Sequence, residues 1–131
     1  LNRAVSRALR DAETPGAIVN FSSQGWWTGG FGGSVVYNAS KGGVTTMTKG
    51  LARTLAPHGI RVNPVAPGGV DTPMMRDGMS EDALAAFLTM VPLGRLAQTD
   101  ELAGAVVFLA SDAASFITGA VINVSGGQLM Y

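Results

Sequence analysis

Cysteine is absent from the 131-residue chain, and histidine, charge and long apolar runs are all scarce. The lack of cysteine excludes a disulfide framework and a thiolate metal site, and the single histidine, His58, excludes a histidine-rich zinc site. Lysine plus arginine and aspartate plus glutamate number 9 each, so there is no excess positive charge for binding nucleic acid or an anionic membrane. No apolar run reaches the length of a membrane-spanning helix. We therefore expect no metal, nucleic-acid or membrane partner, and a cytoplasmic protein.

The residues that are present favour one folded domain over residues 1–131. Hydrophobic residues make up 47% of the chain and charged residues only 14%, which is too apolar for a disordered protein. The length is that of one ordinary domain, and no repeat or linker divides it. The chain begins at Leu1 without an initiator methionine, so we consider both a processed chain and a fragment of a longer one.

The spacing of apolar residues predicts helices that alternate with strands. Helices are expected at 2–12, about 36–56, from Ser80 and from a cap at Thr99, and strands at 17–21, 60–66 and 120–124. Residues 22–34, rich in glycine and serine, are expected to form a loop, and Pro64 is expected to cause a bulge or a local loss of strand pairing. Alternating helices and strands imply parallel pairing through right-handed crossovers. The predicted fold is therefore α/β, with about three parallel strands and flanking helices.

A tyrosine and a lysine are spaced for acid–base chemistry at the start of the long predicted helix. Tyr37 and Lys41 are four residues apart, which places them one turn apart on the same face. An ammonium group at that separation stabilises a phenolate and makes the phenol a usable proton donor and acceptor. Ser23 follows the first predicted strand, and ligands bind at the carboxyl ends of parallel strands. The loop from Gln24 to Ser34 is long enough to bring Ser23 beside Tyr37.

Purely structural interpretations of these residues stand beside the functional ones. Most tyrosine–lysine pairs at this spacing are a half-buried tyrosine next to a solvated lysine, and serine also caps turns. Trp26 and Trp27 are equally compatible with lining a substrate pocket and with packing the loop. A hydrolase that uses Ser23 is disfavoured because the chain has no G-x-S-x-G motif.

Several spaced motifs in one order distinguish these interpretations. They are Ile18–Ser23 (IVNFSS), Tyr37–Val44 (YNASKGGV), Ile60–Asn63 (IRVN), Ala66–Gly68 (APG), Thr72–Met74 (TPM), and Thr118–Gly119 followed by Gly126–Gly127. Together they resemble the C-terminal half of a classical short-chain dehydrogenase/reductase, and the resemblance covers essentially the whole chain. It implies the C-terminal part of a Rossmann-like, doubly wound parallel sheet.

The resemblance also implies an activity and a role for each matching residue. The activity is NAD- or NADP-dependent interconversion of a small secondary alcohol and a ketone, in a homodimer or homotetramer. Tyr37 would be the general acid/base, Lys41 would stabilise its phenolate and bind the nicotinamide ribose, and Ser23 would polarise the substrate oxygen. The implied cofactor-binding residues are Tyr37, Lys41, Pro67, Gly68, Val70 and Thr72, and the implied substrate-binding residues are Ser23, Gln24, Trp26 and Tyr37.

The chain also departs from the family pattern. The glycines between Gly29 and Gly33 do not fit the G-x-G-x-x-G register, so we expect the N-terminal dinucleotide-binding half to be absent from residues 1–131. The alternative function is thus a truncated, catalytically incompetent fragment that retains mainly an oligomerisation surface. The spacing from Ser23 to Tyr37 is one residue longer than is usual in the family, which keeps Ser22 as an alternative to Ser23.

Overall fold

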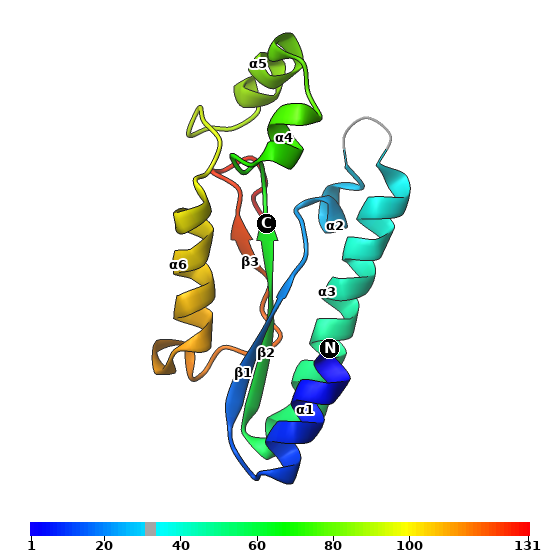
Figure 1. The fold of residues 1–131 in the computed structure, drawn as a ribbon, viewed down its shortest axis with the longest axis vertical. Coiled ribbons are helices and arrows are strands. Elements are labelled where there is room, and N and C mark those ends of the chain that lie inside the picture. The colour runs from blue at the N-terminus through cyan, green and yellow to red at the C-terminus, as the bar shows by residue number, and fades with distance from the viewer. Residues whose placement is uncertain (31–33) are drawn as a thin grey trace.

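The computed structural model describes residues 1–30 and 34–131, which form a parallel sheet with helices on both sides (Figure 1). The strands are β1 (Gly16–Phe21), β2 (Ile60–Pro67) and β3 (Ile122–Val124), in the order β1-β2-β3. Both strand pairs are parallel, with Ile18 opposite Val62 and Ala66 opposite Asn123. The expected α/β fold with three parallel strands and flanking helices is confirmed.

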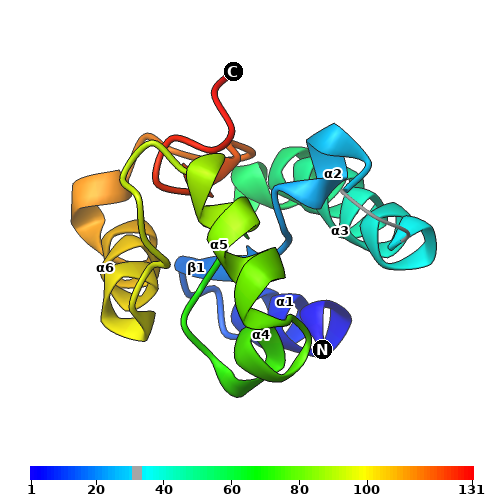
Figure 2. The ribbon, with the colours of Figure 1, turned by 90° about the horizontal axis from the view of Figure 1, so that it is seen from above.

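The two longest helices cover opposite faces of the sheet. Seen from above, α3 (Val35–Leu55) and α6 (Thr99–Ala110) lie on either side of the strands (Figure 2). Side chains alternate between these faces along β1, because successive residues of a strand point in opposite directions. Ile18 packs into the apolar cluster on the α3 side, and Val19 packs into the cluster on the α6 side.

The core on the α3 side explains the apolar spacing of the long helix. Ala52 and Leu55 of α3 pack against Ile60 and Val62 of β2, and all four side chains are buried. Leu9 of α1 (Asn2–Asp11) packs against the same cluster. The helix ends in a short 3-10 turn, Ala56–His58, before the chain enters β2. This packing anchors the C-terminal half of α3 and leaves its first turns at the carboxyl end of the sheet.

Polar side chains of β2 hold the chain that returns from α6 to β3. Asn63 is fully buried; its Nδ2 donates to the Ile117 carbonyl at 2.8 Å, and its Oδ1 accepts from the Ala120 N–H at 3.0 Å. Arg61 donates to the Leu109 carbonyl at 2.8 Å, close to the 3-10 turn Asp112–Ala114. Asn63 thus serves a loop whose backbone groups have few other partners.

The start of α6 differs by one residue from the sequence-based expectation. The helix begins at Thr99, but its N-cap is Gln98, so the prediction of Thr99 as the cap was wrong. The reason is Glu101, whose carboxylate accepts the Gln98 N–H at 2.7 Å and binds the Arg95 guanidinium at 2.7 Å. A carboxylate at the third helical position makes this reciprocal bond to the N-cap residue.

The Glu101 contacts predict an acid-dependent contribution to stability. The Arg95 guanidinium, and after it the Gln98 N–H, lowers the pKa of the Glu101 carboxyl from 4.5 to about 2. Glu101→Gln is expected to lower the melting temperature at pH 7. Because a depressed folded-state pKa stabilises only while the carboxylate is charged, the difference from the parent shrinks as pH falls from about 4.5 to about 2. Thermal unfolding followed by circular dichroism measures it.

The control for this prediction is Glu81→Gln, which changes a glutamate in the first turn of α5 (Glu81–Thr89). Within the described residues Glu81 forms no salt bridge, whereas Arg95 pairs with Glu101. Glu81→Gln should therefore change the melting temperature less at pH 7. If the difference in melting temperature between Glu101→Gln and the parent stays constant from pH 7 to pH 2, the prediction is wrong.

Pro64 does not interrupt the sheet, contrary to the expected bulge. The β1–β2 register runs without a break from Gly16 to Phe21, with Asn20 opposite Pro64. The Val65 carbonyl accepts from Ser22 on the β1 side, so the nitrogen of the preceding residue faces the β3 side. Pairing with β3 begins only at Val65, so the N–H that proline lacks falls just outside the β2–β3 ladder.

Three short helices gather at the carboxyl end of the sheet (Figure 1). Within the predicted loop the chain forms α2 (Gly25–Thr28); residues 31–33 of that loop lie outside the described part of the chain. After β2 come α4 (Pro73–Asp77) and α5, the latter capped by Ser80 as predicted, since its Oγ accepts the Ala83 N–H. In residues 1–30 and 34–131 no helix combines the length and apolar character needed to cross a membrane.

Candidate active site

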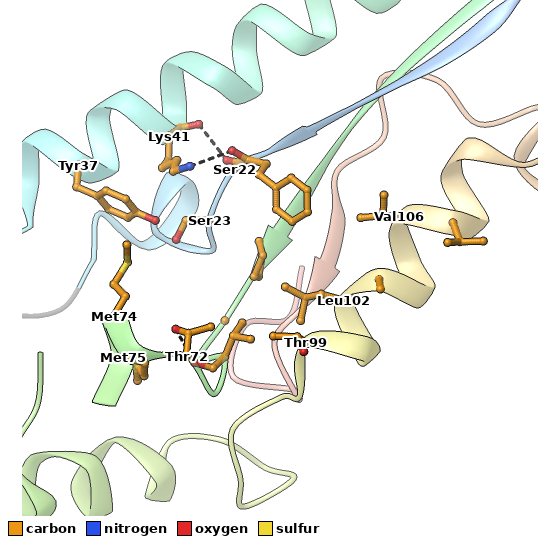
Figure 3. A pocket seen from close by; sticks show the side chains of 16 residues that line it. Ser22, Ser23, Tyr37, Lys41, Thr72, Met74, Met75, Thr99, Leu102 and Val106 are labelled. Atoms are coloured by element: carbon orange, nitrogen blue, oxygen red, sulfur yellow. Dashed lines mark hydrogen bonds between the residues drawn. The ribbon is translucent and has the colours of Figure 1, made fainter. Parts of the chain in front are cut away.

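A cavity of about 710 Å³ opens at the carboxyl end of the sheet, where the sequence predicted a ligand site. Its walls come from the end of β1, the start of α3, the segment after β2, α4 and α6 (Figure 3). Tyr37 and Lys41 lie on one side, and side chains of α6 such as Leu102 and Val106 lie across from them. The cavity wall is mainly apolar, with few polar groups placed within it.

Helix α3 positions the tyrosine and the lysine. Both lie in its first two turns, as the spacing predicted, and the Lys41 ammonium is 5.6 Å from the centre of the Tyr37 ring. Lys41 Nζ also donates to the carbonyl of Phe21, the last residue of β1, at 3.0 Å. Tyr37 is 49% exposed, so its ring faces the open space rather than the core. The arrangement holds a cation beside an accessible phenol.

The two serines after β1 point to different places, which separates their functions. Ser22 is buried, and its Oγ contacts the Lys41 carbonyl and the Thr45 hydroxyl on α3. Ser23 lies at the cavity, and its Oγ accepts the Gly25 N–H at 3.2 Å. Figure 3 shows the Tyr37 hydroxyl directed toward the Ser23 side chain. This placement favours Ser23 over Ser22 as the serine that meets a ligand.

A second, smaller cavity of about 250 Å³ lies beside the first. Residues common to both walls are Ser23, Tyr37, Gly68 and Met75. Apolar side chains from the segment 73–89 and polar groups from α2 and the start of α3 complete the smaller wall. The Tyr37 and Ser23 side chains therefore stand between two adjoining spaces, each able to hold part of a ligand.

The segment that follows β2 lines the larger cavity, as expected for Pro67, Gly68, Val70 and Thr72. A Cβ at Gly68 would lie 2.9 Å from the Cα of Ser125, so only glycine allows this close approach of the two strand ends. The site residues predicted after β2 are thus brought to the same cavity as Tyr37, Lys41 and Ser23.

Gln24 and Trp26, predicted to contact substrate, lie at different distances from the site. Gln24 is buried; it lines the smaller cavity and donates through Nε2 to Gln128 Oε1 at 2.6 Å. Trp26 is not among the residues that line either cavity. Its ring packs edge-on against Trp27 and Tyr131, with centroids 5.3 and 6.0 Å away. Trp26 therefore packs with other aromatic rings, and its contact with substrate stays a prediction.

The sequence did not identify several residues that line the larger cavity. Helix α6 supplies part of the wall, although its apolar spacing indicated only a core-facing side. The signal that could have found the members on α6 is that its apolar residues, from Leu102 to Leu109, occupy more than one face of the helix. The residues missed are Phe21, Thr99, Leu102, Ala103, Val106 and Val107.

Ionisable groups are few around the site. Among the described residues that line the larger cavity, Tyr37 and Lys41 are the only titratable side chains. Nearby, the guanidinium of Arg76, in the last turn of α4, binds Asp71 through two bonds of 2.5 and 2.7 Å and lowers the pKa of that carboxyl. This ion pair holds the segment between β2 and α4 that carries Val70 and Thr72.

Comparisons with known proteins found several similar to this chain. A family model described as enoyl-(acyl carrier protein) reductase matches residues 1–128. Cis-4-hydroxycyclohexanecarboxylate dehydrogenase of Sinomonas cyclohexanicum is 49% identical over 122 residues, 92% of this chain and 48% of that protein. The 3-oxoacyl-(acyl-carrier-protein) reductase FabG of Escherichia coli (strain K12) is 45% identical over 130 residues, 99% of this chain and 52% of that protein.

A solved structure shows the same arrangement of elements. The crystal structure of an Agrobacterium tumefaciens protein, provisionally assigned as a 2-deoxy-D-gluconate 3-dehydrogenase and containing bound NADP, superposes with a TM-score of 0.90 at 35% identity. The match covers 97% of this chain and 52% of that one. This chain thus spans about half the length of the relatives that it matches.

Proposed function

The chain belongs to the short-chain dehydrogenase/reductase family, and from that premise we propose that it is the catalytic half of an NAD(P)-dependent oxidoreductase. The reaction is the interconversion of a secondary alcohol and a ketone. The observation that carries the proposal is the position of Tyr37 and Ser23 between two adjoining cavities, with the Lys41 ammonium 5.6 Å from the Tyr37 ring. A proton donor shared by two ligand spaces suits transfer between two bound molecules.

The larger cavity fits a nicotinamide ring and its ribose. Apolar walls from Pro67, Val70 and α6 suit a flat ring, and the Thr72 hydroxyl and Lys41 ammonium supply polar contacts. The bound dinucleotide supplies hydride acceptance and donation at its nicotinamide ring. In this cavity Lys41 would bind the ribose, and Thr72 and Gly68 would border the nicotinamide ring. The rest of the nucleotide needs residues that lie beyond this chain's cavity wall.

The residues of this chain control the proton and the orientation of the substrate. During alcohol oxidation the Ser23 hydroxyl donates to the substrate oxygen, and the Tyr37 phenolate oxygen takes the alcohol proton as hydride leaves the carbon. The Lys41 ammonium stabilises that phenolate electrostatically. In ketone reduction the Tyr37 hydroxyl returns the proton to the carbonyl oxygen. Every proton transfer therefore passes through one atom, the Tyr37 phenolic oxygen.

The smaller cavity is proposed to hold the substrate. Its volume of about 250 Å³ suits a small molecule, and its wall combines the apolar side chains of Met79 and Phe87 with Gln24 and Thr28. The relatives act, by their names, on a hydroxycyclohexanecarboxylate and on a 3-oxoacyl group. A secondary alcohol or ketone with an apolar body is the substrate class that this wall favours.

Association into a homodimer or homotetramer is part of the proposal. Large apolar side chains are exposed on α3 and near the end of α6, among them Val36 (83% exposed), Met47, Val107 and Phe116. Exposed apolar side chains in such numbers are typical of surfaces that bind another subunit. The cytoplasm is the proposed location.

The test compares this chain alone with a protein in which an N-terminal nucleotide-binding half of the family precedes it. NAD(P)H fluorescence titration and oxidation of a panel of secondary alcohols are measured for both. The longer protein is expected to bind the dinucleotide and turn over at least one alcohol. The chain alone is expected to bind far more weakly, because the adenosine contacts are missing.

The matched control is Lys41→Met in the longer protein, which keeps an apolar side chain of similar length and removes the ammonium. It should lose turnover and weaken binding of the dinucleotide. If the longer protein oxidises none of the alcohols and reduces none of the ketones with either dinucleotide, the alternative of a catalytically incompetent fragment replaces the proposal.

A further inference from the structure

A buried row of polar side chains joins β1 to α3 directly beneath the proposed active site. Asn20 and Ser22 point from β1 to the same side, and each meets a threonine hydroxyl of the helix. Asn20 Nδ2 donates to Thr48 Oγ1 at 3.0 Å, and Ser22 Oγ lies 2.7 Å from Thr45 Oγ1. We call these four residues the β1–α3 seam. Thr45 and Thr48 are among the most buried side chains of the protein, at 1% and 0% exposure.

The Ser22–Thr45 contact includes the backbone of Lys41. The Lys41 carbonyl is 3.0 Å from Ser22 Oγ and 3.0 Å from Thr45 Oγ1. The two hydroxyl protons can be placed in more than one way among these three contacts. In each placement, both hydroxyl oxygens and the carbonyl oxygen take part in at least one hydrogen bond. A helix carbonyl normally accepts one hydrogen bond, from a backbone N–H of its own helix. The Lys41 carbonyl additionally contacts two side-chain hydroxyls.

Lys41 is thus held at both ends by two neighbouring residues, the last residue of β1 and the residue that follows it. Its ammonium donates to the Phe21 carbonyl, and its own carbonyl accepts from the Ser22 hydroxyl. The next residue along the chain is Ser23, which lines both cavities. The segment Phe21–Ser23 therefore both holds Lys41 in place and positions Ser23 at the cavities.

We propose that Ser22 and Thr45 are positioning residues that set the Lys41 turn of α3 against the end of β1. The proposal rests on the function proposed above. With the seam intact, the Lys41 ammonium and the Tyr37 phenol keep a fixed separation, and Ser23 keeps its place beside Tyr37. A buried network that is fully hydrogen-bonded specifies one arrangement of the elements it joins. Loss of either hydroxyl lets the turn shift by a fraction of an ångström.

The chain offers controls that separate positioning from stability. Thr48→Val removes an equally buried hydroxyl of the same seam, but its carbonyl partner is Val44 rather than Lys41. Thr54→Val removes the same kind of bond, to the Gly50 carbonyl at 3.0 Å, on the exposed side of the helix. Thr45→Ser keeps the hydroxyl at the site.

The experiment measures kcat, KM and the pH profile of alcohol oxidation for these variants in the complete enzyme. Ser22→Ala and Thr45→Val are expected to lower kcat about tenfold, with substrate KM changed less than about twofold. The midpoint of the rising limb of the pH profile is expected to move upward by about half a unit, because a displaced ammonium stabilises the phenolate less. Thr45→Ser should restore the parent profile.

Thr48→Val is expected to lower the melting temperature without moving the pH midpoint, and Thr54→Val to change neither. If Thr45→Val and Thr48→Val have the same pH midpoint and the same kcat relative to the parent, the seam is only structural and the positioning role is wrong. Tyr37→Phe, measured alongside, keeps the two proposals apart. Turnover that survives Tyr37→Phe refutes the proposed function, whereas turnover lost in Tyr37→Phe but unchanged in Thr45→Val refutes positioning alone.

Discussion

Replacing Tyr37 with phenylalanine in the complete enzyme is expected to lower kcat by about three orders of magnitude. The substitution removes one oxygen, which is the atom through which every proposed proton transfer passes. It keeps the ring that lines both cavities, so the walls remain intact. Binding of NAD(P)H should therefore change little. Steady-state kinetics of alcohol oxidation, with fluorescence titration of the dinucleotide, measures both quantities.

Tyr131→Phe is the matched control for this experiment. Tyr131 also has an exposed ring, at 58%, but it packs against Trp26 and Trp27, and partial burial there raises the pKa of its phenol. Its substitution should leave kcat within about twofold of the parent, since surface changes away from a site have small effects. Equal kcat values for the two variants would show that the Tyr37 hydroxyl carries no proton in the reaction.

Asn63→Ala is expected to lower the stability of the protein strongly. The side chain is 1% exposed and serves both the Ile117 carbonyl and the Ala120 N–H. Its removal leaves the Ala120 N–H without its partner, leaves the Ile117 carbonyl with only the 3.4 Å bond from Arg61, and opens a small cavity, which together cost about 3 kcal/mol of unfolding free energy. Urea denaturation of the longer protein measures this change.

Asn2→Ala, the same chemical deletion at the start of α1, is the control for Asn63→Ala. No side-chain hydrogen bond caps the start of that helix, so the free energy of unfolding should change by less than about 0.5 kcal/mol. If the two variants unfold at the same urea concentration, Asn63 does not support the chain between α6 and β3, and the hydrogen bonds assigned to it contribute nothing net.

The sequence predicted most of the fold because its long elements have regular apolar spacing. The three strands and the helix from Val35 to Leu55 bury apolar residues at characteristic intervals, and the structure has them at nearly the predicted positions. Helices α2 and α4, of 4 and 5 residues, were not predicted because a single turn carries no periodic signal. The effect of Pro64 was wrongly predicted because the sequence does not show which neighbouring strand the proline nitrogen faces, or whether pairing with that strand reaches the proline.

The candidate site residues could be predicted where their positions follow from spacing along one helix or from the end of one strand. Tyr37 and Lys41 share a helix face, and Ser23 ends a strand, so local geometry brings them to one cavity. The place of Trp26 could not be predicted because a loop aromatic can turn either toward a cavity or toward other aromatic rings. The β1–α3 seam was not predicted either, since its partners are 23 and 28 residues apart in the chain and meet only after folding.

The length of α3 makes the reaction mechanically sensitive to distant parts of the protein. Leu55, in the last turn, lies about 27 Å along the helix axis from Tyr37, at a rise of 1.5 Å per residue. If the helix tilts about its packed end, a tilt of about 2° displaces the phenol by about 1 Å, enough to slow a positioned proton transfer about a hundredfold. Changes of side-chain volume around Leu55 and Ala52 are therefore expected to alter turnover of the complete enzyme, and the contacts of Ser22 with Lys41 and Thr45 oppose such a tilt.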